Sequence, residues 1–280
     1  MFYLLNRFIQ MKILLNNNEL NEALYGVSDL GFVPTMGSLH KGHISLIKKS
    51  LKECKKTIVS IFVNPKQFNN KNDYKSYPRN NRKDLLILKK LKVNFLFMPK
   101  EKDIYNLKRK SLIKLKKKDR VLCAKFRKGH FEGVIDVMER LTKIIGPQKI
   151  YMGEKDFQQL YLVKKYIQKK YRAKIIPCKT IRDSNKFAFS SRNTFLNKTE
   201  LFQAREIARE MFFLKKKLAK TKNIKKLISE KRKELTRLFN IRFDYLELRN
   251  IINLKNSKRV KNAKLFIAYY INKVRLIDNF

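Results

Sequence analysis

Short apolar runs alternate with amphipathic helical stretches through the first two-thirds of the chain, and this alternation constrains the fold more than any other feature. The run at 57–63, TIVSIFV, is β-branched and almost wholly apolar, as expected of a strand buried on both faces. The same reasoning predicts further strands at 31–34, 93–98, 149–152 and 174–181. It also predicts a helix that starts within 40–43, and further helices at 81–91, 131–145 and 157–170. This β-α-β-α order predicts an α/β fold with a doubly wound, parallel, Rossmann-like sheet.

The pattern changes after about residue 181. Residues 199–239 are helical and Lys-rich, whereas 243–248 and 265–271 have the composition of strands. A length of 280 residues is enough for one large domain or two ordinary ones. We therefore expect a first domain at 1–180 and a smaller α+β C-terminal domain at 181–280.

The chain is strongly basic, with 67 Lys and Arg against 23 Asp and Glu and a formal net charge of +44. Such a charge alone suggests a nucleic-acid partner. Here, however, the Lys and Arg residues are scattered through most segments, and no RRM, KH or zinc-finger pattern is visible. Lys, Asn, Ile, Tyr and Phe are abundant together, as A+T-rich codons would produce. We expect no specific nucleic-acid partner, since that alternative requires Lys and Arg clustered among exposed aromatic residues.

The cysteines and the N-terminus indicate a compartment. The three cysteines are widely spaced, without a C-x-x-C pair, so neither a zinc site nor a disulfide framework is predicted. The apolar start from Met1 to Leu5 is interrupted by Asn6 and Arg7, and no signal-peptide cleavage site follows. No run of about twenty apolar residues is present. We expect a cytoplasmic protein with no membrane span.

The stretch at 34–43, PTMGSLHKGH, joins the first predicted strand to a helix. Its glycine permits a turn, and His40 and His43 are three residues apart at the helix start, where they can share a face. The first helical N–H groups have no internal partner, and the positive end of the helix dipole points outward. Such a place receives phosphate. An isolated H-x-G-H would more often be a capped helix with two solvated histidines. The ten-residue context favours the phosphate site.

Two further motifs directly follow predicted strands. N-P-K-Q-F follows the strand at 57–63, and the amides of Asn64 and Gln67 can both donate and accept hydrogen bonds there. G-E-K-D-F-Q-Q-L follows the strand at 149–152, where Lys155 can neutralise a phosphate. An ordinary Asn-Pro turn and a helix capped by Asp156 are the bland alternatives. Ligands of doubly wound sheets bind beyond the carboxyl ends of the strands, which favours a ligand role for both motifs.

The segment S-S-R-N follows the last predicted parallel strand. Ser190, Ser191 and Arg192 offer two hydroxyl groups and a guanidinium, which together make a compact clamp for an oxyanion. By composition alone, four polar residues are far more often a loop. Gln158 and Gln159 raise a similar alternative, since on the predicted helix both could simply face solvent.

Together these motifs resemble those of the pantothenate synthetases, or pantoate–β-alanine ligases, which belong to the H-x-G-H nucleotidyltransferase superfamily. The resemblance runs from about Phe32 to Asn279 and includes R-K-G-H-F-E-G-V, Y-P-R and the terminal R-L-I-D-N. It implies an ATP-dependent enzyme that condenses pantoate with β-alanine to pantothenate through a pantoyl adenylate, releasing AMP and pyrophosphate. It also implies Mg²⁺ and a homodimer. The alternative is another H-x-G-H adenylyltransferase with a phosphorylated acceptor, which would share the opening motif without N-P-x-Q-F or the Q-Q pair.

The resemblance also implies individual roles. Stabilisation of phosphate charge is assigned to His40, His43, Lys155, Ser190, Ser191 and Arg192. The ATP contacts are Met36, Gly37, Ser38, Leu39, His40, Lys41, Gly42, His43, Gly153, Glu154, Lys155, Asp156, Ile181, Phe189, Ser190, Ser191 and Arg192. Gln67, Gln159 and Asn64 are expected to bind pantoate, and Asp84 is expected to be a Mg²⁺ ligand. Residues 1–180 would bind nucleotide and pantoate, and 181–280 would act as a lid. The chain departs from the family where Asn185-Lys186 replaces an Asp-Gly turn.

Overall fold

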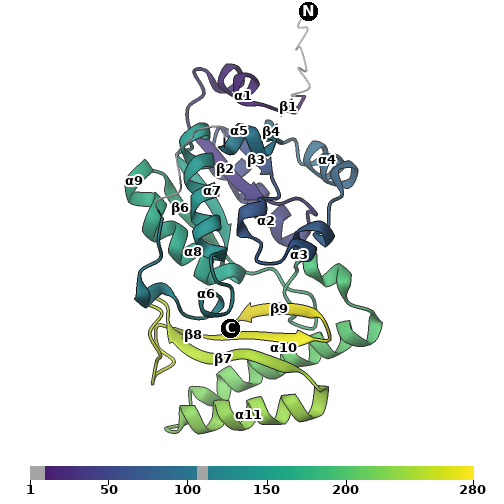
Figure 1. Cartoon of the computed structure of the whole chain (residues 1–280), viewed down its shortest axis with the longest axis vertical. Coiled ribbons are helices and arrows are strands. Elements are labelled where there is room, and N and C mark those ends of the chain that lie inside the picture. The colour runs from purple at the N-terminus through teal and green to yellow at the C-terminus, as the bar shows by residue number, and fades with distance from the viewer. Residues whose placement is uncertain (1–9, 106–112) are drawn as a thin grey trace, which may run out of the picture. The chain divides into compact units, whose positions relative to one another are not determined.

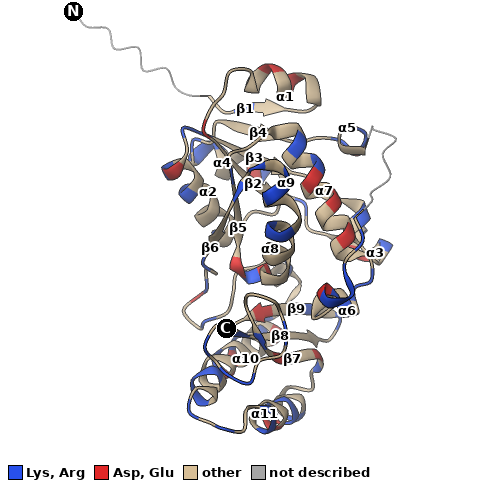
Figure 2. Cartoon of the chain, turned by 90° about the vertical axis from the view of Figure 1, so that its left-hand side faces the viewer, with Lys and Arg blue, Asp and Glu red and all other residues tan. Residues whose placement is uncertain are grey.

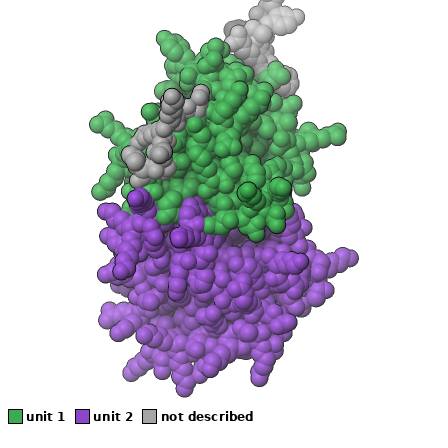
Figure 3. Space-filling model, viewed as in Figure 1, with its two compact units in different colours: residues 1–113, 132–152, 163–178 green, residues 114–131, 153–162, 179–280 purple. Residues whose placement is uncertain are grey.

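The computed structural model describes residues 10–105 and 113–280, so the apolar start from Met1 to Leu5 lies outside the described residues. The chain forms two compact units (Figure 3). The first comprises residues 1–113, 132–152 and 163–178, and the second comprises 114–131, 153–162 and 179–280. These units differ from a linear division at residue 180, because two earlier segments group with the C-terminal residues.

The first unit is built on a six-stranded parallel sheet with the strand order β1-β4-β3-β2-β5-β6 (Figure 1). Its strands are β1 Lys12–Leu14, β2 Leu30–Thr35, β3 Lys56–Ile61, β4 Phe95–Phe97, β5 Lys149–Gly153 and β6 Lys174–Cys178. Its main helices are α1 Asn17–Leu24, α2 Lys41–Glu53, α3 Lys71–Ser76, α4 Asn81–Lys90, α5 Glu101–Tyr105 and α7 His130–Ile145. The parallel α/β sheet predicted from the alternating pattern is confirmed. β1 and α1 were not predicted, and β1 adds a strand at the edge of the sheet.

Burial on both faces explains the apolar composition of the central strands. Every residue of β3 after Lys56 is buried, and β2 pairs with it in register from Leu30↔Lys56 to Thr35↔Ile61. Figure 2 shows α2 and α4 on one side of these strands and α7 on the other. Gly31 lets α2 approach β2 closely, since a Cβ there would lie 2.2 Å from the Oγ of Ser50. The strand order reverses between β2 and β5, the point where doubly wound sheets bind ligands.

The second unit contains a three-stranded antiparallel sheet of β7 Arg242–Asn250, β8 Ala263–Ile271 and β9 Val274–Asn279. Its two long helices are α10 Lys198–Leu218 and α11 Ile224–Phe239, so the helical stretch predicted at 199–239 is interrupted. The Asn223 side chain accepts from the N–H of Lys226 and starts α11. β9 was not predicted as a strand.

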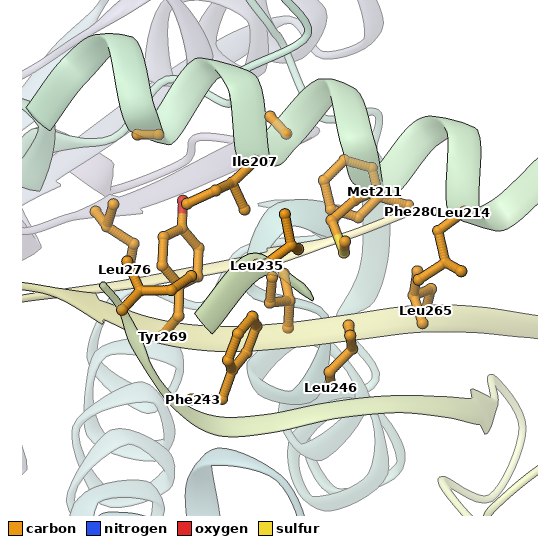
Figure 4. Packing of buried hydrophobic residues seen from close by; sticks show 14 of the residues in the cluster. Ile207, Met211, Leu214, Leu235, Phe243, Leu246, Leu265, Tyr269, Leu276 and Phe280 are labelled. Atoms are coloured by element: carbon orange, nitrogen blue, oxygen red, sulfur yellow. The ribbon is translucent and has the colours of Figure 1, made fainter. Parts of the chain in front are cut away.

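A separate apolar core holds this sheet against its helices. Figure 4 shows Ile207, Met211 and Leu214 of α10 directed toward the same core as Leu235 of α11 and Leu265 of β8. All five side chains are nearly or completely buried. Burying a side chain of this kind contributes about 1.5–3 kcal/mol, so this core gives the C-terminal α+β region its own source of stability. Within residues 10–105 and 113–280, no helix has the length and apolar character needed to cross a membrane.

Candidate functional site

The histidine motif forms a tight loop between β2 and α2. The backbone takes positive φ angles at Gly37 (+77°) and Ser38 (+51°) before turning into α2. His40 is the N-cap, and its Nδ1 accepts a hydrogen bond from the N–H of Gly42 at 3.1 Å. The Nδ1 of His43 accepts from the N–H of His40 at 3.4 Å, so the two side chains cap the helix reciprocally. Their ring centroids lie 4.0 Å apart.

These contacts determine which nitrogen of each ring carries the proton. Because Nδ1 accepts in both His40 and His43, the hydrogen of each neutral ring resides on Nε2. Both rings therefore carry an Nε2–H donor at the start of a helix, where anions bind. Gly42 is required here, since a Cβ would lie 2.8 Å from the Cε1 of His40. The capped-helix and phosphate interpretations of the motif are thus compatible, because different nitrogens serve each.

Asp84 on α4 holds this loop in place. One carboxylate oxygen accepts from the N–H of Ser38 and the other from the N–H of Leu39, each at 2.7 Å. The side chain is completely buried. Burial raises the pKa of the Asp84 carboxyl, and the two N–H groups act in the opposite direction. Each oxygen already accepts one backbone N–H, so Asp84 has a structural role in holding this loop, and the Mg²⁺-ligand role expected from the resemblance stays a prediction.

The N-P-K-Q-F motif forms a short 3-10 helix, η1 Pro65–Gln67, after β3. The Nδ2 of Asn64 donates to the carbonyl of Gly133 at 3.1 Å, and its Oδ1 accepts from the hydroxyl of Tyr105 at 2.8 Å. Asn64 is almost completely buried and anchors the motif, and its expected role as a pantoate ligand stays a prediction. Gln67 extends toward the histidine loop, with its Nε2 2.9 Å from the Sδ of Met36.

The close approach of α7 to this motif depends on Gly133. A Cβ at that position would lie 2.3 Å from the carbonyl oxygen of Lys66. The second glycine in R-K-G-H-F-E-G-V therefore permits close packing around Gln67. Tyr105, which bonds Asn64, was not singled out from sequence, because the two residues are 41 positions apart and meet only in the folded chain.

In the second unit, G-E-K-D forms a 3-10 turn, η3 Glu154–Asp156, followed by α8 Phe157–Val163. The carboxylate of Glu154 pairs with the Nζ of Lys264 at 3.2 Å. Gln158 is buried and donates to the carbonyl of Val121 at 2.7 Å, which shows that the solvent-facing alternative is wrong for this residue. Gln159 is half-buried. Gln158 thus anchors α8, and Gln159 is the member of the pair that remains a candidate ligand.

The chain before S-S-R-N forms a small hairpin. The N–H of Phe189 donates to the carbonyl of Ile181 at 3.1 Å, which brings together two expected ATP contacts. Ser190 then starts a 3-10 helix, η5 Ser191–Phe195, and its hydroxyl accepts from the N–H of Arg192 at 3.3 Å. The local backbone therefore arranges the two serines and the arginine as one compact turn.

Lys186 occupies the tip of this hairpin with a positive φ of +68°, in the place where the family pattern has glycine. We expect Lys186→Gly to raise the free energy of unfolding by about 0.5–1 kcal/mol. The left-handed conformation costs an L-residue about 1–2 kcal/mol, and the greater freedom of unfolded glycine offsets about half of that gain. Thermal unfolding measures the effect.

The control is Lys216→Gly, the same change at an exposed position inside α10, which we expect to lower stability by about 1 kcal/mol. A fall in stability for Lys186→Gly as well would show that the turn is not strained.

Some of the expected site residues belong to the first unit and the others belong to the second. The first brings the histidine loop, Asp84 and Gln67 together; the second joins G-E-K-D to the C-terminal strand and sets the hairpin before S-S-R-N. In 10–105 and 113–280, no group of three or more His, Cys, Asp or Glu side chains could hold a metal ion. Arg182, Asp278 and Asn279 were not among the predicted site residues, although the R-L-I-D-N match was a signal for the last two.

Comparisons with known proteins agree with the motifs. A family profile described as pantoate-beta-alanine ligase matches residues 11–280. A pantothenate synthetase of Francisella tularensis subsp. novicida is 39% identical over 274 residues, which is 94% of this chain and 93% of the relative. The crystal structure of the pantothenate synthetase from Thermus thermophilus has a TM-score of 0.90 and 30% identity, covering 96% of this chain and 99% of that one.

A second solved structure carries ligands. It is the pantoate-beta-alanine ligase from Francisella tularensis complexed with beta-gamma ATP and beta-alanine, with a TM-score of 0.81 and 36% identity. The similarity covers 96% of this chain and 97% of that chain. The profile match begins at residue 11, so the likeness extends beyond the start at Phe32 that the motifs alone indicated.

Proposed function

Because the chain belongs to the pantoate–β-alanine ligase family, we propose that its histidine loop, Lys155 and the S-S-R-N turn stabilise phosphate charge in a two-step ligation. The chain is an ATP-dependent ligase that condenses pantoate with β-alanine to pantothenate. A carboxylate is a poor electrophile, so the acid must be activated before the amine can attack. The reciprocal capping of His40 and His43, which leaves an Nε2–H on each ring, carries the proposal for the first step.

In that step a pantoate carboxylate oxygen bonds to the α-phosphorus of ATP. The bond from that phosphorus to the bridging oxygen breaks, and pyrophosphate leaves with the electron pair. Negative charge grows on the leaving phosphates, where the donors of His40 and His43 and the cation of Lys155 would stabilise it. Ser190, Ser191 and Arg192 would add hydroxyl and guanidinium donors. The remaining ATP contacts expected from the motifs stay part of this proposal.

In the second step the β-alanine nitrogen bonds to the acyl carbon, the bond from that carbon to the AMP oxygen breaks, and the amine loses a proton. No protein nucleophile is needed, so catalysis rests on positioning and electrostatics. Gln67 and Gln159 would hold pantoate through both steps, since amides can both donate to and accept from its hydroxyl groups.

Mg²⁺ enters this proposal with the nucleotide. It commonly keeps several waters and binds substrate phosphates with few protein ligands, so a MgATP complex needs no dedicated protein cage. We assign no residue to it. A homodimer and a cytoplasmic location also stay proposals. All three cysteines are buried and form no disulfide, which is compatible with a reducing compartment. Sedimentation of the full chain tests the dimer.

The test of the proposed function is isotope exchange. We expect labelled pyrophosphate to exchange into ATP when pantoate is present and β-alanine is absent, because adenylation is reversible and precedes attack by the amine. Omitting pantoate is the control and should abolish the exchange. Exchange that requires a phosphorylated acceptor instead would identify another H-x-G-H adenylyltransferase.

A further inference from the structure

The last strand of the chain holds the G-E-K-D turn by its backbone. The Nδ2 of Asn279 donates to the carbonyl oxygens of Glu154 and Lys155, at 2.8 and 2.9 Å. Asn279 is 3% exposed, and its Oδ1 has no hydrogen-bond partner. The orientation of the amide is therefore determined, since the opposite orientation would place Oδ1 against two carbonyl oxygens. One side chain thus fixes two successive peptide groups, one of which belongs to Lys155.

The preceding residue holds the other nucleotide segment. Asp278 accepts two hydrogen bonds from the guanidinium of Arg182, at 2.6 and 2.8 Å. The same guanidinium donates to the carbonyls of Lys186 and Asn279, at 2.9 and 2.8 Å. Arg182 follows Ile181, and its backbone forms a bridge with Ala188 across the hairpin that leads to Ser190. Two planar hydrogen bonds of this kind fix direction as well as distance.

Two aromatic rings lie beside the guanidinium. The rings of Phe212 and Phe280 lie 5.1 and 4.7 Å from the Cζ of Arg182, and the two ring centroids are 4.9 Å apart. A cation near an aromatic face is attracted to it, and the attraction is stronger where the charge is removed from water. Arg182 is therefore bound by Asp278 and contacted by Phe212 and Phe280, which gives the hairpin one defined position.

We propose that Asp278 and Asn279 are positioning residues for ATP, which hold the Lys155 turn and the hairpin before Ser190 in register with each other. Neighbouring residues of one strand perform the two tasks, so a shift of β9 would move both segments together. The proposal rests on the proposed function only in taking these segments as ATP contacts. If these residues served only folding, their substitution would weaken the binding of all substrates alike. If they position the ATP contacts, it should weaken the binding of ATP selectively.

The test is Asn279→Asp, which has nearly the same shape but replaces two N–H donors with an oxygen facing two carbonyls. We expect about tenfold weaker ATP binding by calorimetry on the full-length protein and an equal rise in the KM for ATP, since each unpaired buried group costs about a factor of ten or more. The KM for β-alanine should stay within about twofold, because no carbonyl that binds Asn279 is assigned to that substrate. Asn272→Asp is the matched control: it makes the same charge change at an exposed turn of the same sheet, and ATP binding should be unchanged.

Asn279→Ala provides a second variant, which removes the donors without adding charge and carries the test if Asn279→Asp unfolds. ATP affinity that stays at the wild-type value in Asn279→Ala would overturn the proposal, as would equal losses for ATP and β-alanine. Calorimetry with ATP alone requires no acceptor. A wild-type protein that binds ATP but shows no pantoate-dependent exchange would therefore refute the pantoate chemistry and leave this comparison valid.

Discussion

His43→Ala should slow formation of pantoyl adenylate by about 10²–10³, the usual cost of losing one donor aimed at developing charge. The Nδ1 of His43 accepts from the N–H of His40, so in the neutral ring the donor that we expect to stabilise the departing pyrophosphate is Nε2–H. Attack of β-alanine on supplied pantoyl adenylate should change far less, because no triphosphate remains. Single-turnover assays of each half-reaction measure the two effects separately.

Two conservative variants separate capping from phosphate binding. In His43→Asn the new amide Oδ1 can replace Nδ1 as the acceptor for the His40 N–H. The shorter side chain has no donor at the position of Nε2, so adenylation should remain slow. In His43→Gln the amide N–H can replace the Nε2–H donor, so this variant should recover part of the adenylation rate. Gln159→Ala serves as the contrasting variant, since it should weaken pantoate binding and impair both steps. Full activity in His43→Asn would show that His43 acts only as a helix cap.

Asp84→Asn should lower the free energy of unfolding by about 1–3 kcal/mol, because an amide can accept from only one of the Ser38 and Leu39 N–H groups. The other N–H would face the new NH₂ group inside a completely buried site. We also expect adenylation to slow by roughly 10²-fold, since a displacement of about 1 Å in a positioned group costs that much. Thermal unfolding and single-turnover adenylation provide the two measurements.

Asp103→Asn is the matched control. Asp103 also accepts from a backbone N–H, that of Lys100 at 2.8 Å, but at an exposed helix start where water can replace the bond. It should change neither stability by more than about 0.5 kcal/mol nor the adenylation rate. If Asp84→Asn instead kept normal stability and lost activity only because it required a higher Mg²⁺ concentration, Asp84 would be a Mg²⁺ ligand and the structural role would be wrong.

Several features could be predicted from sequence because they depend on neighbouring residues. The buried strand at 57–63 and the turn-to-helix pattern around His40 are visible in hydrophobic periodicity and in the placement of glycine. The likeness to the pantoate–β-alanine ligases, carried by these motifs, is confirmed. The individual ATP and pantoate contacts stay predictions. β9 was missed, because its strand character depends on pairing with β8 and its sequence VRLIDN includes two charged residues.

The sequence alone determined the α/β architecture, the order of the motifs and the chemistry that they share, since each strand, helix and motif is encoded within a short run of consecutive residues. Only the tertiary structure decided which polar side chains support those motifs. Asp84 meets the histidine loop from 45 residues away, and Asn279 reaches the Lys155 carbonyl across a separation of 124. A buried carboxylate or amide must satisfy its hydrogen bonds wherever the folded chain brings a partner. Tertiary packing determines which residue that partner is, so a local sequence pattern cannot predict it.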